Sequence, residues 1–135
     1  MTNALYGKAR QAFLDGDLDW SAATIKAVLV DLADYTPVID THEFLSDIPS
    51  GARVATSAAF TGKTSTLGVA DAADISFATV VGDQSEALVI YADTGVVGTS
   101  RLIAFIDTAT GLPVTPNGGN VNVTWDNGAN RIFKL

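Results

Sequence analysis

The chain has 135 residues, no cysteine and a net charge of −7, and 47% of its residues are hydrophobic whereas only 17% are charged. This length suits a single domain with one core, and the absence of cysteine excludes disulfides, thiolate metal sites and cysteine nucleophiles. The eight lysines and arginines are scattered along the chain, which argues against nucleic acid or a membrane surface as a partner.

The number of charged side chains is small relative to the surface area of a folded chain of this mass. A folded chain of 14.0 kDa exposes about 6,700 Å², and 8 basic plus 15 acidic side chains cover that area thinly. Apolar runs such as Ala87–Tyr91 are far shorter than the ~20 residues of a membrane-spanning helix. We therefore expect other subunits to cover part of the surface. Met1–Lys8 lacks the pattern of a signal peptide, so we expect synthesis in a cytoplasm.

The N-terminal residues predict a short helix over Ala4–Leu14. Apolar side chains recur on one face of this segment, Thr2 or Asn3 can cap its start, and Gly16 can end it. The next apolar run, Ile25–Asp31, also has spacing that suits a helix. We interpret it as a buried strand, because its β-branched residues fit a pleated surface better.

Tyr35–Gly51 is expected to be a connection that contains one or two helical turns. Thr41 is placed to be the N-cap of these turns. Phe44, Leu45 and Ile48 are expected to point toward the core, since they share one side of such a segment.

From Arg53 onward the sequence predicts only strands and turns. The expected strands are Arg53–Phe60, Thr64–Val69, Ile75–Val81, Ala87–Tyr91, Leu102–Ile106, Val121–Trp125 and Arg131–Leu135. We therefore expect a mainly β fold, an antiparallel sandwich or partly open barrel of about seven or eight short strands with a short N-terminal helix. The expected organisation is one domain over 1–135, with a helical segment at 1–16 and a β-meander core at 52–135.

The last four expected strands, between Ala87 and Leu135, are joined by turn-forming sequences. These are Asp93-Thr94-Gly95, the longer loop Asp107–Gly119, and Asp126-Asn127-Gly128. Turn residues between consecutive apolar runs are typical of a meander, in which each strand pairs with the next.

Two motifs resemble ligand-binding loops but lack residues that the chemistry needs. Gly62-Lys63-Thr64 resembles the end of a phosphate-binding loop, yet Ser57 stands where that loop has its first glycine. The acidic turn Asp15–Asp19 resembles the start of a calcium loop, but Trp20 and Lys26 replace the required glycine and glutamate. We expect both to be ordinary turns, and we expect no metal and no cofactor.

His42 is the only histidine of the chain. Ser46 stands where a zinc-protease helix would have its second histidine, so a surface or capping role is expected for His42. A small hydrolase that uses His42 with a nearby carboxylate is the weakest of the functional hypotheses. The acid pairs that fall in expected turns are Asp71 with Asp74 and Asp83 with Glu86.

Several short segments of the sequence resemble those of a known group of proteins. They are Ala4–Arg10, Ile25–Asp31, Phe44–Pro49, Gly68–Ala72, Thr110–Gly119 and Trp125–Gly128. In these segments and over nearly its full length, the chain is similar to small virion structural proteins of tailed bacteriophages.

The resemblance implies a role in assembly rather than catalysis. It implies a non-enzymatic head decoration (cement) protein that binds the major capsid protein, located in the virion after synthesis in the bacterial host cytoplasm. Because an icosahedral lattice offers two-fold and three-fold sites, the chain is expected to form a dimer or trimer with itself. A neck, tail or fibre-associated component is an alternative.

A receptor- or glycan-binding tip is a further alternative. In that role Trp20, Tyr91 and Trp125 would stack on sugars. We favour core or subunit contacts for these three aromatic side chains.

The subunit interface is expected to use Met1–Leu14 and the loop Asp107–Asn120. Two prolines stiffen that loop and lower the entropy lost on docking, although it also suits an ordinary surface connection, and the helix also suits a cap on its own core. The candidate interface residues are Leu5, Tyr6, Phe13, Leu112, Pro113, Pro116, Phe133 and Leu135. Ile132–Leu135 must be covered, by this subunit or by its neighbour.

Overall fold

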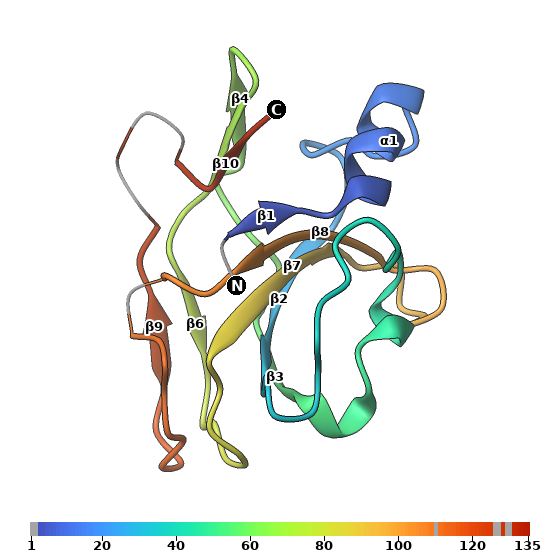
Figure 1. Ribbon diagram of the computed structural model, residues 1–135. Helices are drawn as coiled ribbons and strands as arrows, with labels where there is room; N and C mark the ends of the chain where they lie inside the picture. Colours follow the sequence, from blue (N-terminus) through green and yellow to red (C-terminus); the bar gives the residue numbers. More distant parts are fainter. Residues whose placement is uncertain (1–2, 110, 126–127, 129–130) are drawn as a thin grey trace.

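The computed structural model describes residues 3–109, 111–125, 128 and 131–135. In this part of the chain, ten strands form three antiparallel sheets around one α-helix, α1 (Gly7–Asp15), and two 3-10 turns, η1 (Leu45–Asp47) and η2 (Ser50–Ala52). The expected mainly β, antiparallel fold is confirmed. No sheet closes into a barrel within these residues, and the arrangement fits an open sandwich (Figure 1).

The largest sheet has five strands in the order β1-β8-β7-β2-β3. Their bounds are β1 (Ala4–Leu5), β8 (Arg101–Ile106), β7 (Ala87–Ala92), β2 (Ile25–Val30) and β3 (Arg53–Thr56). The three central strands are buried almost throughout. This burial on both faces explains why their sequences are continuous apolar runs rather than alternating patterns.

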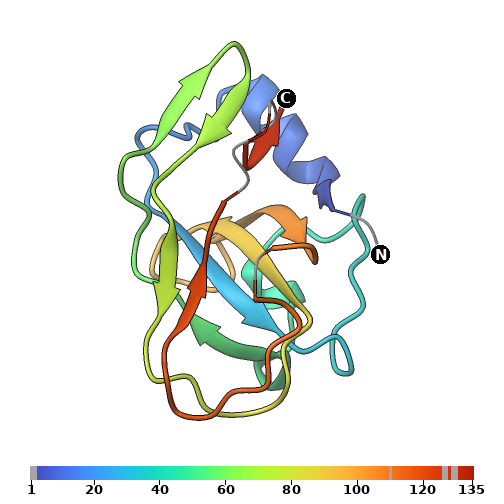
Figure 2. The same ribbon diagram turned by 90° about the vertical axis from the view of Figure 1, so that its left-hand side faces the viewer.

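Two smaller sheets complete the fold. One has the order β10-β5-β4, with β10 (Phe133–Lys134), β5 (Val69–Asp71) and β4 (Thr64–Thr66), and the other pairs β6 (Ile75–Phe77) with β9 (Val121–Val123). β6 and β9 lie in front of the five-stranded sheet in Figure 2 and form a second layer. Their residues alternate between buried and exposed, as strands with one wet face do.

A group of aromatic side chains joins the layers. The ring of Phe133 lies 6.1 Å from that of Phe13 and 5.3 Å from that of Trp20. Phe60 continues the group, with its ring 6.2 Å from Trp20 and 5.6 Å from Trp125. Helix α1 is therefore held to the C-terminal strand by ring packing, and Phe133 is covered by its own subunit.

The helix begins later than the sequence predicts. Ala4 and Leu5 pair with β8 instead, opposite Phe105 and Ala104. Tyr6 is the N-cap residue in extended conformation, so the expectation of a Thr2 or Asn3 cap is wrong. Ala4 and Leu5 form an edge strand instead of a first helical turn, because pairing with β8 satisfies their backbone hydrogen-bonding groups.

The helix ends as the sequence predicts. Gly16 adopts a left-handed conformation with φ of 78°, and its N–H donates to carbonyl oxygens of the last turn. Glycine suits this C-terminal position because it has no side chain to clash there.

The single strand expected over Thr64–Val69 is a hairpin. β4 ends at Thr66, and Leu67 and Gly68 form a two-residue turn with φ of 50° and 80° before β5 begins. Leucine is unusual in this conformation, so the sequence carries only Gly68 as a signal for the turn. With β1, this hairpin raises the number of strands from the eight expected to ten.

The meander expected after Ala87 is correct only for its first two strands. β7 pairs with β8, but β9 pairs with β6 and β10 pairs with β5. The physical reason is that β9 and β10 bury their apolar faces against distant elements, and short-range turn signals do not specify such long-range pairing.

Smaller differences concern element ends. Thr41 lies in a turn rather than at a helix cap, and the helical turn is the three-residue η1, which begins at Leu45. The Asp47 carboxylate accepts hydrogen bonds from the N–H groups of Glu43 and Phe44, at 2.8 and 3.0 Å. Asp47 therefore satisfies backbone groups that Thr41 was expected to satisfy.

Candidate interaction surface

One end of the molecule carries an apolar groove between α1 and the β10-β5-β4 sheet. The groove has a volume of about 300 Å³. Figure 1 shows the last turn of α1, the β4–β5 hairpin and the C-terminus at this end. The lining residues are Phe13, Gly16, Leu18, Asp19, Trp20, Ser21, Ser65, Gly68, Ala70, Phe133 and Leu135.

Three leucines at this end of the molecule are exposed. Leu14 of α1 is 89% exposed, Leu67 at the hairpin turn 94%, and the C-terminal Leu135 57%. Leu135 lines the groove, and each of the other two is bonded to a lining residue, Phe13 or Gly68. Single exposed leucines are ordinary on protein surfaces, but three beside one apolar groove are typical of a contact surface.

Two charged residues at the groove, Asp19 and Lys63, form hydrogen bonds within the chain. The Asp19 carboxylate accepts hydrogen bonds from Ser21 N–H at 2.9 Å and Ala22 N–H at 3.2 Å. The Lys63 ammonium group donates to the carbonyl oxygen of Ala23. Gly62 lies in a bend and Thr64 begins β4, whereas Asp15 ends α1 and residues 17–19 form the connection that follows. Lys63 ties the start of β4 to the segment after α1.

Three of the eight candidate interface residues line the groove. Phe13 is half-buried in its wall, Phe133 is buried in its floor, and Leu135 is exposed at its rim. Leu5 is half-buried and lines a different hollow. Tyr6 is fully buried, so it has no surface to offer a partner, because its ring is enclosed by its own subunit.

The loop 107–120 lies against its own subunit. Val114 and Ser85 exchange two backbone hydrogen bonds of 2.9 Å, and the Val80 N–H donates to Gly119 at 2.9 Å. Leu112 and Pro116 are half-buried, and Pro113 is exposed. Among the described residues of this loop, Pro113 is the most accessible of the three candidates.

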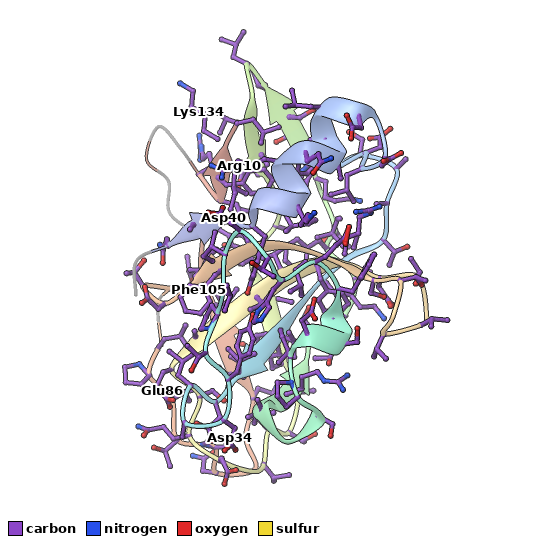
Figure 3. All side chains as sticks on the ribbon, turned by 45° about the vertical axis from the view of Figure 1, so that its right-hand side comes forward. Arg10, Asp34, Asp40, Glu86, Phe105 and Lys134 are labelled. Atoms are coloured by element: carbon purple, nitrogen blue, oxygen red, sulfur yellow. The ribbon has the colours of Figure 1, made fainter. Side chains whose placement is uncertain are left out.

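A larger hollow of about 840 Å³ lies between β1–β8 and the residues around β10. Its apolar lining includes Leu5, Phe105 and Trp125, and Arg131 and Lys134 add positive charge. Figure 3 shows Lys134 near the helix end of the molecule and Phe105 below it. This hollow adjoins the open side of β1, which has only two paired residues.

His42 is part of a chain of hydrogen bonds that fixes the loop before η1. Its Nδ1 accepts from Val38 N–H at 3.3 Å and lies 3.0 Å from the Tyr35 hydroxyl, which in turn lies 2.9 Å from the Tyr6 hydroxyl. Because the Val38 N–H must donate, Nδ1 is the acceptor nitrogen, Tyr35 donates to it, and Tyr6 donates to Tyr35. Burial and the neighbouring Tyr35 raise the pKa of Tyr6.

The acid pairs noted in the sequence have structural partners. Asp74 accepts a hydrogen bond from Trp125 N–H at 2.9 Å, Asp71 lies 3.9 Å from Arg131, and Glu86 accepts from Leu32 N–H at 2.9 Å. The carboxylates of Asp31, Asp34 and Asp83 gather within 4.8 Å of one another. Figure 3 shows Asp34 and Glu86 at the end of the molecule away from α1. We assign no metal to this group, since the buried Asp31 carboxylate accepts a hydrogen bond from Ala33 N–H and the other two acids are exposed in an acidic chain.

Sequence reasoning missed the most exposed residue of the groove end, Leu67. It assigned Leu67 to the middle of a strand, where its side chain would have had a neighbour. The Leu-Gly dipeptide was the available signal, because glycine in the second position of a two-residue turn favours a hairpin.

The chain matches no known protein-family model, and no curated protein matches its sequence. None of the helices in the described residues is long and apolar enough to cross a membrane.

Proposed function

We propose that the chain is a non-enzymatic structural protein of a tailed-bacteriophage virion, and specifically a head decoration protein that stabilises the capsid lattice. Its partners in this proposal are other copies of itself and the major capsid protein. The phage assignment rests on the resemblance of short sequence segments to small virion structural proteins. The contact role rests on the groove end described above.

The observation that carries the contact role is the exposure of Leu14, Leu67 and Leu135 beside one apolar groove. Only 17% of the residues are charged, and contact with another protein would bury these leucines. Burial of each leucine stabilises the contact by about 1.5–3 kcal/mol. A decoration protein contacts neighbours across a shell and needs a surface of this kind.

The positions of the aromatic residues favour assembly over a glycan-binding tip. Trp20, Tyr91 and Trp125 are between 3% and 6% exposed. A sugar stacks on the open face of an aromatic ring, and these rings are packed against core residues instead. The three side chains thus serve as core, as the sequence analysis favoured.

Copy number per virion, measured by quantitative mass spectrometry of purified particles, tests this proposal. A decoration protein should be present in roughly hundreds of copies, in proportion to the major capsid protein, because it repeats with the lattice symmetry. About a dozen copies would instead indicate a neck component, and three or six a fibre, since those structures have low cyclic symmetry. Either low count, or absence from the particle, would overturn the decoration role.

A second measurement addresses binding directly. Purified chain should bind to capsids assembled from the major capsid protein alone and should saturate in a fixed ratio to it. Leu14→Ser should weaken this binding, whereas Val38→Ser, at a 47% exposed position away from the groove, should not. Equal effects of the two substitutions would remove the groove end from the capsid contact.

A further inference from the structure

We propose that two copies of this chain form a two-fold symmetric dimer through the open edge of β4, with Leu67 of each copy entering the groove of the other. The inference goes beyond the virion role and does not depend on it, because it concerns the purified chain in solution. Four observations carry it: the open strand edge, the register that the hairpin dictates, the conformation of Leu67, and the charge pattern.

The first observation is that β4 is an edge strand without the usual protection. It pairs only with β5 among the described residues, and Thr64, Ser65 and Thr66 are all exposed. Edge strands normally carry charges, prolines or bulges that prevent pairing with another chain. β4 has none of these in its sequence, and the adjacent Lys63 is held by Ala23 of its own chain.

The second observation is the direction of the free backbone groups. In a two-residue hairpin the residues that flank the turn, here Thr66 and Val69, form a hydrogen-bonded pair. The next pair is then of the other type, so the N–H and C=O of Ser65 point to the open edge. Ser65 is the residue at which a further strand can form two hydrogen bonds.

This register favours a second copy of the chain over another partner. Thr64-Ser65-Thr66 reads the same in both directions, so an antiparallel pair centred on Ser65 places Thr64 of each copy opposite Thr66 of the other. Threonine pairs on neighbouring strands are favourable. Such a pair has a two-fold axis perpendicular to the sheet, and it joins the two three-stranded sheets into one of six strands.

The third observation is that Leu67 combines an unfavourable backbone conformation with an exposed apolar side chain. Its φ is 50° in a turn that favours asparagine or glycine, and its side chain is 94% exposed. An unfavourable backbone conformation that persists at an exposed position points to a function for the side chain. Contact with a second molecule supplies that function.

Geometry brings Leu67 to the groove of the second copy. Alternation along the chain puts Lys63 and Ser65 on one side, and this is the groove side, because Ser65 lines the groove and Lys63 reaches Ala23. Leu67 follows in the turn, next to Gly68, which also lines the groove. In the register centred on Ser65, Leu67 of one copy lies opposite Lys63 of the other. It therefore lies beside the groove of the other copy, next to the Ser65 that lines it.

The fourth observation is electrostatic. Residues 64–70 carry no charge, and the nearest charged neighbour before them is basic. Two chains that each carry −7 repel through most of their surfaces. The β4 strand brings no carboxylate of its own to such a contact, and the Asp19 carboxylate of the groove is bonded to the N–H groups of Ser21 and Ala22.

The test is the mass of the purified chain in solution, measured by sedimentation equilibrium over a concentration series. We expect a monomer–dimer equilibrium for the wild type. Leu67→Asn should give a monomer over the same series while it unfolds as cooperatively as the wild type, since asparagine suits the turn better than leucine. The matched control Val96→Asn replaces another exposed apolar residue, 58% exposed and on the loop after β7, and should leave the dimer intact.

Ser65→Pro is the second variant, because it removes the outward N–H without changing the pairing of Thr66 with Val69. It should also give a folded monomer. A wild type that stays monomeric, or that forms trimers, overturns the proposal. A dimer that survives both Leu67→Asn and Ser65→Pro overturns it as well and would place the contact elsewhere on the surface.

Discussion

At the scale of single residues, Gly7 illustrates how a position that weakens a helix can be required by packing. A Cβ on Gly7 would lie 2.8 Å from the Asp40 carboxylate and 3.3 Å from the Asp40 Cα. Arg10 of the same helix lies 3.7 Å from that carboxylate, and Figure 3 shows the two side chains beside each other. Glycine therefore allows the loop before η1 to approach the start of α1.

We predict that Gly7→Ala lowers the free energy of unfolding by about 1–2 kcal/mol, because overpacking outweighs the better helix propensity of alanine. Urea denaturation measures the difference. Gly51→Ala is the control, since its Cβ would have no neighbour within 4 Å among the described residues, and it should be neutral or slightly stabilising. Equal stability of the two variants would show that the Asp40 contact does not matter.

The buried hydroxyl chain gives a second prediction at the residue scale. Tyr35→Phe removes the acceptor of the Tyr6 hydroxyl, which is fully buried, and should lower the free energy of unfolding by about 1–3 kcal/mol. Tyr6→Phe removes a donor but leaves Tyr35 bonded to His42, so it should cost only about 0.5–1.5 kcal/mol. Thermal or urea unfolding measures both.

The order of these two effects is the informative result. A larger loss for Tyr6→Phe than for Tyr35→Phe would contradict the inferred direction of the chain from Tyr6 to His42. Tyr91→Phe serves as a separate reference, because Tyr91 is buried on β7 and is not part of the chain of hydroxyl groups from Tyr6 to His42.

At the scale of elements, the C-terminal strand holds the helix in place. Phe133 of β10 contacts both Phe13 of α1 and Trp20. We predict that Phe133→Ala costs about 3–5 kcal/mol, because it removes a buried ring and leaves a cavity. Leu135→Ala, two residues later and 57% exposed, should change stability by less than about 0.5 kcal/mol.

Calorimetric unfolding of the two variants separates the contributions. Loss of helix signal in the far-ultraviolet circular dichroism of Phe133→Ala before global unfolding would indicate that α1 detaches first. A small effect of Phe133→Ala, similar to that of Leu135→Ala, would contradict the inferred role of β10.

The elements that the sequence predicts well are those whose burial is encoded locally. β2, β7 and β8 are continuous apolar runs, and a run of that length and composition is a strand buried on both faces. The β4–β5 hairpin was missed because Leu67 gives no turn signal. The pairing of β9 with β6 was missed because it depends on burial between distant segments.

The interaction surface, too, is only partly encoded by the local sequence. Phe13, Phe133 and Leu135 could be expected near an interface because they are large apolar residues at the chain ends, and all three line the groove. Tyr6 has the same character in sequence but is enclosed by the core. Which of two similar residues is exposed depends on the tertiary packing, which local pattern does not specify.

At the scale of the whole molecule, the two ends of a single chain carry different exposed side chains. The exposed area is 6684 Å², close to the roughly 6,700 Å² expected for this mass. The groove end carries exposed leucines, whereas the opposite end carries Asp34 and Glu86 (Figure 3). Acidic residues are not confined to that opposite end, since Asp15 ends α1 and Asp19 lines the groove. The exposed leucines, rather than a division of charge, therefore favour the groove end as the contact surface.

Titrating groups give the whole molecule a defined range of pH stability. Burial raises the pKa of Tyr6, Tyr35 and Tyr91, so the folded state keeps protons that the unfolded state releases above about 10. On the acid side, the hydrogen bond from Lys26, at 2.8 Å, lowers the pKa of Asp93. Burial raises the pKa of Asp47, but the N–H groups of Glu43 and Phe44 outweigh this and lower it.

We predict that the free energy of unfolding is highest between about pH 5 and 9 and falls on both sides of that range. Above about 10 it falls because the unfolded state releases tyrosine protons that the folded state retains, and below about 4 it falls because the unfolded state binds protons that Asp93 and Asp47 resist. Urea unfolding at fixed ionic strength across this range measures the profile. Asp93→Asn should flatten the acid side and also part of the alkaline side, because Asp93 raises the pKa of both Lys26 and Tyr91. Tyr91→Phe should flatten the alkaline side alone. If Asp93→Asn left the acid slope unchanged, the Lys26 pair would not contribute to stability, and other carboxylates would have to account for acid unfolding.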